Sequence, residues 1–149
     1  MESNKIIEKK MYKKAIDLIS ERYPKDWGGA AAVALEDGTI LTSVAPEVLV
    51  AATELCIETG AILEAHKLDK RVTHSICVVR DNEYSDFKVL SPCGVCQERL
   101  RFWGTEVKVG ITTFEKDLKF VTLDTLQPYH WTNAYPKEEL EYYKNHHSD

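Results

Sequence analysis

The chain has 149 residues, of which 44% are hydrophobic and 29% charged, with a formal net charge of −5. This length fits a single domain over residues 1–149 with a substantial buried core. The acidic balance argues against a nucleic-acid surface, which is usually basic, and no apolar run approaches the ~20 residues that span a bilayer. The first residues do not resemble a secretory signal. We therefore expect a cytoplasmic protein that acts on a small molecule, with no nucleic-acid or membrane partner.

The first half of the chain predicts a helix, a hairpin and a second helix. Apolar residues at helical spacing predict a helix over 4–22, which ends at Tyr23-Pro24. Strands over 30–35 and 39–44 flank the turn Glu36-Asp37-Gly38. Residues 47–68 favour a helix, and we expect it to start just ahead of Cys56.

The second half alternates strands and helices. A short buried strand is predicted over 75–79, followed by a loop that closes at Leu90 and a helix over 93–103 that ends at Gly104. Strands over 107–112 and 118–123 and a helix over 137–144 complete the pattern. This order predicts an α/β protein: a three-layer α/β/α sandwich with a mixed five-stranded sheet.

Three cysteines and one glutamate form the most informative pattern. Cys56 precedes Glu58 by two residues, and the segment Pro92-Cys93-Gly94-Val95-Cys96 follows. Cys93 and Cys96, three apart at a helix start, share one face and can meet Cys56 around one point. Three protein ligands leave a tetrahedral zinc ion one open position, as in catalytic sites. We predict one zinc ion per chain, held by Cys56, Cys93 and Cys96, with Glu58 as the catalytic proton carrier.

Other interpretations of these residues stay open. A structural zinc site would only staple the fold and would not require Glu58. Cys77 lies in an apolar strand and is interpreted as a small buried hydrophobe, with a role as a fourth ligand as the alternative. The histidines have no ligand spacing; they are His66, His74, His130, His146 and His147.

The Cys-x-Glu and Pro-Cys-x-x-Cys pattern is the signature of zinc deaminases. The chain resembles the cytidine deaminase superfamily, small homotetrameric members above all, over roughly residues 23–132. The resemblance is carried by segments 30–38, 91–96 and 126–131. It implies hydrolytic deamination of a free cytosine nucleoside in pyrimidine salvage, with Glu58 moving protons from water to the ring and to the leaving ammonia. It also implies a homo-oligomer, either a tetramer or a dimer.

The resemblance further implies a set of substrate-binding residues. An aromatic residue near the family C-terminus closes the base pocket of a neighbouring subunit, and Trp131 takes that place here. The full set implied is Trp27, Ala45, Glu47, Ile57, Ser91 and Trp131.

Two departures from the family pattern bear on substrate and metal. The ribose-binding Asn-x-Glu is Ala45-Pro46-Glu47 here, and an Ala side chain makes no hydrogen bonds. Blasticidin S or another modified nucleoside or base is therefore the alternative substrate, since blasticidin S deaminases share the fold. The Arg that neutralises thiolate charge in three-cysteine members is replaced by Thr59. Either the metal is less electrophilic, or another cation substitutes; the candidates are Arg99, Arg101 and Lys67.

Overall fold

A mixed β-sheet forms the centre of the computed structural model, which describes residues 2–140 and 142–147. Its strands are β1 (Gly28–Leu35), β2 (Ile40–Ser43), β3 (Val72–Arg80), β4 (Lys88–Leu90), β5 (Lys108–Gly110) and β6 (Phe120–Thr122). The strand order is β2-β1-β3-β5-β6, and β4 pairs with β3 off this path. The β3–β5 pair is parallel and the other pairs are antiparallel. The predicted mixed sheet is confirmed, and β4 adds a short strand where a loop was expected.

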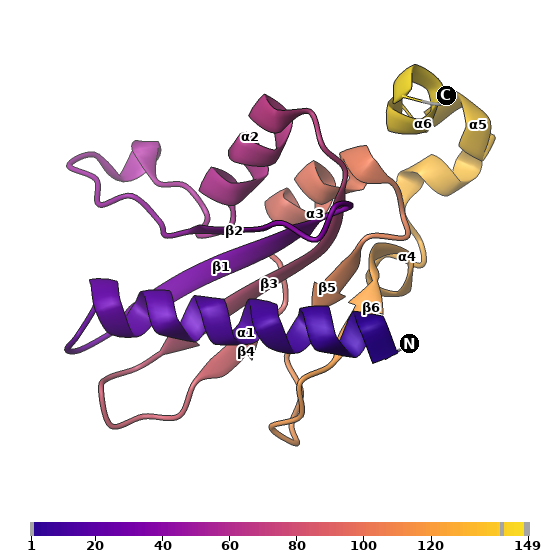
Figure 1. The fold of residues 1–149 in the computed structure, drawn as a ribbon. Helices are drawn as coiled ribbons and strands as arrows, with labels where there is room; N and C mark the ends of the chain where they lie inside the picture. The colour runs from indigo at the N-terminus through magenta and orange to yellow at the C-terminus, as the bar shows by residue number, and fades with distance from the viewer. Residues whose placement is uncertain (1, 141, 148–149) are drawn as a thin grey trace.

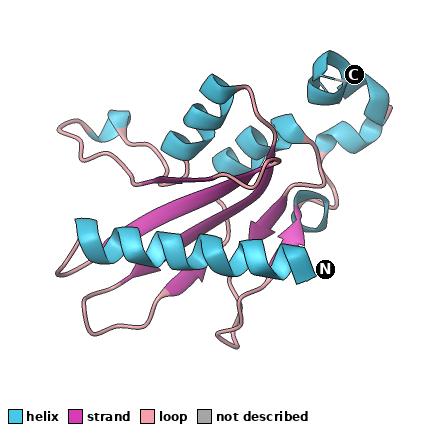
Figure 2. Ribbon diagram, viewed as in Figure 1, coloured by secondary structure: helices cyan, strands magenta, loops and turns pink. Residues whose placement is uncertain are grey.

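Helices cover both faces of the sheet (Figures 1 and 2). Helix α1 (Glu2–Arg22) lies across one face, and α2 (Thr59–Leu68) and α3 (Gly94–Leu100) lie on the other. The predicted three-layer α/β/α sandwich is therefore confirmed. No helix in the described part of the chain is long and apolar enough to cross a membrane.

Strand alternation separates two cores. Side chains two residues apart on a strand share a face. The core under α1 contains Met11, Ala15, Ile19, Ala30, Ala32, Ala34, Ile76 and Val78. The core under α2 and α3 contains Val33, Ala61, Ile62, Leu100 and Val109, among others. Residues 29 and 31 of β1, and Cys77 and Val79 of β3, alternate with the first core and so face the α2 and α3 side.

Helix α2 starts later than the sequence predicts. Residues ahead of it form a loop with the short 3-10 helix η1 (Ala51–Thr53), and Glu58 is the residue that caps α2. The loop is anchored to the end of β2, because Ser43 Oγ donates to the carbonyl oxygen of Ile57 at 2.7 Å. A Cβ on Gly60 would lie 2.9 Å from Ser43 Cβ, which explains a glycine inside this helix. Tertiary contact with β2 thus overrides the helix propensity of residues 47–58.

The C-terminal third contacts α3 through Gln127 and His130, which both bond to Glu98. It contains η2 (Arg101–Trp103), α4 (Leu123–Leu126), η3 (Trp131–Ala134), α5 (Lys137–Leu140) and α6 (Tyr142–His147). The helix predicted over 137–144 is present as α5 and the start of α6, and residue 141 between them lies outside the described residues.

Candidate active site

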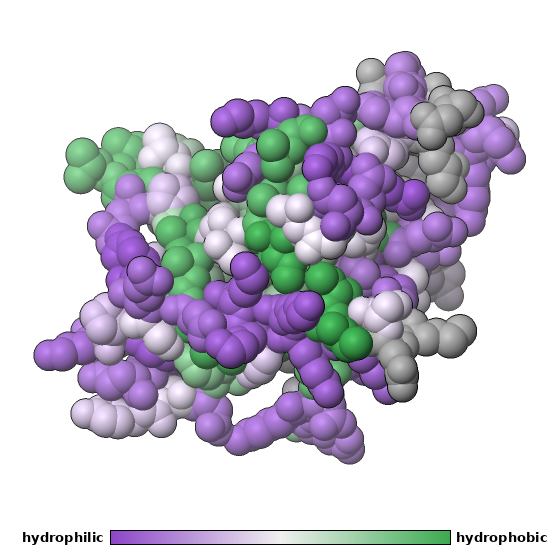
Figure 3. Space-filling view, viewed as in Figure 1, coloured by the Kyte–Doolittle hydropathy of each residue, from purple (hydrophilic) through white to green (hydrophobic). Residues whose placement is uncertain are grey.

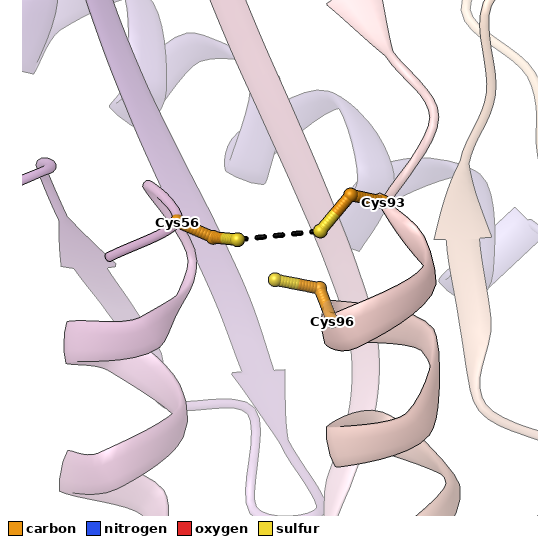
Figure 4. A group of neighbouring side chains, drawn as sticks. All are labelled: Cys56, Cys93 and Cys96. Carbon is orange, nitrogen blue, oxygen red and sulfur yellow. Dashed lines mark hydrogen bonds between the residues drawn. The ribbon is translucent and has the colours of Figure 1, made fainter. Parts of the chain in front are cut away.

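Three cysteine side chains meet between the starts of α2 and α3 (Figure 4). Cys56 comes from the turn ahead of α2, Cys93 directly precedes α3, and Cys96 lies in the first turn of α3. The Sγ atoms of all three lie within 4.8 Å of one another, and those of Cys56 and Cys93 are 3.2 Å apart. Among residues 2–140 and 142–147, this is the group of His, Cys, Asp or Glu side chains placed to hold a metal ion.

The sulfur cluster fits a zinc ion by its geometry and its chemistry. Zn–S bonds of about 2.3 Å at tetrahedral angles place sulfurs about 3.8 Å apart, which is within reach of this arrangement. The ligand type also fits, since thiolates are common zinc ligands. The cluster therefore could hold the metal that the sequence predicts.

Glu58 is buried beside the cluster. Its side chain is only 5% exposed, and the Cys96 thiol donates to Glu58 Oε2 at 3.3 Å. Burial, followed by the negative charge of Glu58, raises the pKa of the Cys96 thiol. A thiolate at Cys96 would stand beside the negative carboxylate of Glu58. A metal ion that took the place of the Cys96 proton would offset the repulsion between these two charges. Glu58 is thus placed next to the metal position without being needed as a ligand.

Backbone amides stabilise negative charge on Cys93. Burial raises the pKa of its thiol. Hydrogen bonds from the backbone N–H groups of Cys96 and Val95 and from the neighbouring thiols lower that pKa by more than burial raises it, so the net shift is downward. Cys93 itself precedes α3 in an extended conformation, with φ −65° and ψ 166°. The turn into α3 therefore both positions the sulfur and favours its ionised form.

Small residues of the central strands form the floor beneath Glu58. Ala31 of β1 pairs with Cys77 of β3, and Gly29 pairs with Val79 on the same face. Cys77 is 5% exposed, and burial, followed by the charge of Glu58, raises its pKa. Cys77 is not one of the three grouped sulfurs. As predicted, Cys77 is a small buried side chain, and it forms part of the floor next to the carboxylate.

Trp27 and Ile57 lie together over Gly29. A Cβ at position 29 would lie 2.9 Å from both Ile57 Cδ1 and Trp27 Cη2. Ile57 stands between Cys56 and Glu58 in the chain, so the Trp27 indole lies next to the segment that carries the catalytic candidates. Trp27 keeps 49% of its surface exposed. The structure thus brings together two of the predicted substrate-binding residues.

The other predicted pocket residues occupy the surrounding loops. Ala45 is half-buried and lies two residues after Ser43, the residue that anchors Ile57. Glu47 is 84% exposed and lies 3.7 Å from Arg22. Ser91 is tied to Thr112, whose backbone N–H donates to Ser91 Oγ at 2.9 Å. Ser43 and Thr112 were missed by sequence analysis, because single hydroxyl residues carry no local signal of a distant partner.

Trp131 lies on a different part of the molecule. It is 65% exposed, and its ring meets that of Tyr135 edge-on at 6.2 Å. It lines a cavity of about 230 Å³ together with Glu98, Arg101, His130 and Lys137, among others. His130 Nε2 lies 2.6 Å from Glu98 Oε1, which ties this segment to α3. In one chain, therefore, Trp131 lies on an exposed segment rather than over Gly29.

Only one of the three candidate cations bonds to the start of α2. Arg99 Nη1 donates to Thr59 Oγ1 at 3.0 Å, and Thr59 directly follows Glu58. Arg101 instead donates to Gln127 Oε1 at 2.8 Å and to Thr132 Oγ1 at 2.9 Å. Lys67 lies in the last turn of α2, at the far end of that helix from the cysteines. Arg99 is thus the cation that the fold brings to the family Arg position.

The fold and the cysteine cluster together define a class: an α/β/α protein with three sulfurs that could hold a metal ion and an adjacent buried carboxylate. Solved structures that are similar to this chain identify the family within this class. The cytidine deaminase from Bacillus anthracis shares 61% sequence identity with a TM-score of 0.89, over 93% of this chain and 99% of that one. The cytidine deaminase from Mycobacterium leprae shares 23% identity with a TM-score of 0.63, over 80% of this chain and 96% of that one. That from Burkholderia pseudomallei shares 17% identity with a TM-score of 0.63, over 81% and 96%.

The family follows from the first of these similarities. At 61% identity over nearly the whole of both chains, the protein belongs to the cytidine deaminase family, whose members are hydrolytic deaminases. The two more distant structures share its fold. No protein-family model and no curated protein matches the chain.

Proposed function

We propose that this protein is a zinc-dependent hydrolase that converts a free cytosine nucleoside, cytidine or deoxycytidine, to the uracil nucleoside and ammonia. The observation that carries the proposal is the group of three sulfurs within 4.8 Å of one another, with the buried carboxylate of Glu58 beside it. A purely structural metal site has no use for a buried carboxylate, whereas hydrolysis needs a group that moves protons. The 61% identity to a cytidine deaminase supports the choice of substrate.

Cys56, Cys93 and Cys96 would hold one zinc ion per chain. When bound, zinc supplies Lewis-acid activation of a water molecule at its open position. Glu58 accepts a proton from that water and delivers it to the ring nitrogen next to the amine-bearing carbon. The oxygen of the water bonds to that carbon, and Glu58 takes the proton of the added hydroxyl and delivers it to the amine. The C–N bond then breaks, ammonia leaves, and the carbon keeps the oxygen as a carbonyl. One carboxylate serves each step because the atoms that exchange protons lie within hydrogen-bond reach of it.

Trp27 and Ile57 supply an apolar wall for the flat ring. An aromatic ring stacks favourably on or against such a surface, and burial there excludes bulk water from the reacting carbon. Ser91, which Thr112 fixes, lies directly before Pro92 and Cys93 and is offered as a polar contact to the base. None of these pocket residues is basic, whereas nucleic-acid surfaces usually are, which is in keeping with a small free substrate.

Arg99 is proposed to offset part of the negative charge that three thiolates bring to zinc. It reaches the start of α2 through Thr59, at 3.0 Å, rather than by standing at position 59 itself. A cation near the cluster favours the thiolate form and restores some of the electrophilicity of the metal.

The sugar contact is where this chain departs from the family pattern. Glu47 can accept hydrogen bonds from a sugar hydroxyl, but Ala45 adds none. A lost hydrogen bond is worth roughly 0.5–1.5 kcal/mol, so cytidine affinity falls only several-fold. This observation is the ground for a second candidate substrate class, modified cytosine nucleosides such as blasticidin S. A role in drug resistance would go with that class, as pyrimidine salvage goes with cytidine.

Ammonia release from a substrate panel tests the substrate assignment. The panel contains cytidine, deoxycytidine, blasticidin S, adenosine and guanine, each offered to the zinc-loaded chain. We expect turnover of the cytosine nucleosides, and the Ala45→Asn variant should improve kcat/KM for cytidine relative to blasticidin S. If no cytosine nucleoside is turned over, the proposed activity is wrong; an unchanged ratio in Ala45→Asn removes the sugar role of this position.

The protein is further proposed to act as a homo-oligomer, a tetramer or dimer, in the cytoplasm. Exposed apolar side chains support the assembly: Leu49 and Val50 are both exposed in the segment between β2 and α2, over which Figure 3 shows hydrophobic surface. Trp131 from one subunit would close the pocket of another. None of the four cysteines, all of which are among the described residues, is in a disulfide, which fits a reducing compartment.

A further inference from the structure

The segment 23–27 carries the chain from the α1 face of the sheet to the face of the active site. Gly28 faces α1, because a Cβ there would lie 2.8 Å from Ile19 Cγ2 and 2.9 Å from Tyr23 Cβ. Gly29 faces the other way, toward Ile57 and Trp27. The path of this short segment therefore decides where the Trp27 indole lies.

A buried arginine holds that segment in place. Arg80, the last residue of β3, is only 6% exposed and pairs with Gly28 in the sheet. Its guanidinium Nη2 donates to the carbonyl oxygen of Tyr23, and its Nε lies 3.5 Å from the carbonyl oxygen of Asp26. One side chain thus gathers two carbonyls from the segment that leads to Trp27. A buried charge whose donors meet main-chain carbonyls fixes their relative positions.

Glu83 holds the same segment from the loop after β3. Its Oε2 accepts the backbone N–H of Asp26 at 2.9 Å. Asp26 has φ 62°, a left-handed conformation that residues with a Cβ rarely adopt without support. Tyr23 in turn meets Trp27 edge-on, with ring centroids 6.2 Å apart. Arg80 and Glu83 therefore support the residues on both sides of the turn that delivers Trp27.

We propose that Arg80 and Glu83 are positioning residues for substrate binding, which fix the segment 23–27 so that Trp27 forms one wall of the nucleoside pocket. The inference rests on the proposed function, in which Trp27 and Ile57 contact the ring. Within the described part of the chain, the hydrogen bonds of Arg80 and Glu83 go to Tyr23 and Asp26, and not to the proton carrier Glu58 or the three cysteines. Loss of the pair therefore weakens the binding of substrate and product and leaves the chemical step intact.

The test compares KM, kcat and the dissociation constant of uridine across variants of the full, zinc-loaded chain. Glu83→Ala removes the acceptor for Asp26, Glu83→Gln keeps one, and Arg80→Lys keeps the charge but loses the two-carbonyl geometry. We expect Glu83→Ala and Arg80→Lys to raise KM and the uridine dissociation constant about three- to tenfold, with kcat within twofold. Glu83→Gln should restore both values, and the exposed Glu21→Ala serves as the matched control without effect.

A double-mutant cycle separates positioning from a general effect on the fold. If Arg80 and Glu83 act through Trp27, then Glu83→Ala should raise KM no further in a Trp27→Ala chain. Multiplicative effects in that cycle would overturn the proposal, as would an unchanged KM in Glu83→Ala when Trp27→Ala raises KM. If Trp27→Ala itself leaves KM unchanged while cytidine is deaminated, the wall role of Trp27 and this inference fail together, but the proposed activity stands. Should Arg80→Lys fail to fold, the Glu83 variants decide the question alone.

Discussion

At the scale of single residues, two cysteines of the candidate site, exposed Cys93 and buried Cys77, have different roles. Cys93 belongs to the group of three sulfurs, whereas Cys77 lies on the floor of the site and outside that group. We predict that Cys93→Ala strips or loosens the zinc ion and that Cys77→Ala retains about one zinc ion per chain. Metal analysis of the purified variants checks both. Full zinc occupancy in Cys93→Ala, or loss of zinc in Cys77→Ala, would contradict the ligand assignment.

Arg99 is a second residue whose effect can be isolated. The Arg99 guanidinium reaches Thr59 beside the cluster, so Arg99→Gln should lower zinc affinity by roughly 10–100-fold. This is the range expected for a residue that supports the metal ligands without binding the metal itself. Lys67→Gln, at the far end of α2, removes one charge as well and should leave the affinity unchanged. Competition with a chelator of known affinity measures both. Equal affinities in the two variants would mean that Arg99 does not compensate the thiolates.

The site residues differ in how far the sequence alone could predict them. Cys56, Glu58, Cys93 and Cys96 can be predicted from the sequence because they belong to two short motifs, Cys-x-Glu and Pro-Cys-x-x-Cys. Within each motif, the spacing of the residues itself indicates a metal site. The structure brings these four together. Arg80 and Glu83 carry no such signal, since their partners lie more than fifty residues earlier in the chain and are backbone atoms.

At the scale of elements, the sheet and its helices follow from hydrophobic periodicity, but their ends do not. The start of α2 was expected ahead of Cys56 and lies at Thr59, because contact with β2 holds the preceding residues out of the helix. Strand β4 was expected as loop, since its three residues Lys88–Leu90 alternate too briefly to show a period. Its pairing with β3 comes from the tertiary fold.

Strand β3 also carries a buried histidine that makes stability depend on pH. His74 is 6% exposed, and burial, followed by the positive charge of Lys108, lowers its pKa to about 4. In the unfolded chain its pKa is about 6.5, so between these values the unfolded state binds the extra proton. Because the pKa of His74 is lower in the folded state, its contribution to the free energy of unfolding is fully present above pH 6.5 and is lost as pH falls toward 4.

The His74→Gln variant tests this dependence. Between pH 6.5 and 4, the free energy of unfolding of the unaltered chain should fall with a slope up to about 1.4 kcal/mol per pH unit steeper than that of the variant. Urea unfolding of both zinc-loaded proteins at several pH values measures the difference, and the shared zinc ligands cancel in the comparison. Parallel slopes would show that His74 titrates alike in the folded and unfolded states.

At the scale of the whole molecule, assembly and activity should be linked through Trp131. We expect sedimentation to give a mass two or four times that of the 17.0 kDa chain. Trp131→Ala and Glu58→Gln chains should each be poorly active alone. Mixed oligomers contain sites with an intact Glu58 from one chain and an intact Trp131 from another, so mixing should restore part of the activity. An active monomer at assay concentration, or a mixture no more active than its parts, would rule out the shared pocket.

The most direct test of the account concerns the proton carrier. Glu58→Gln keeps the shape of the side chain and one acceptor oxygen but cannot shuttle protons. Zinc content and cytidine turnover should be measured together on this variant and on Glu64→Gln, an exposed residue of α2. The account predicts about one zinc ion per chain in both, with turnover reduced at least ~10²-fold in Glu58→Gln alone. Near-normal turnover in zinc-loaded Glu58→Gln would contradict it.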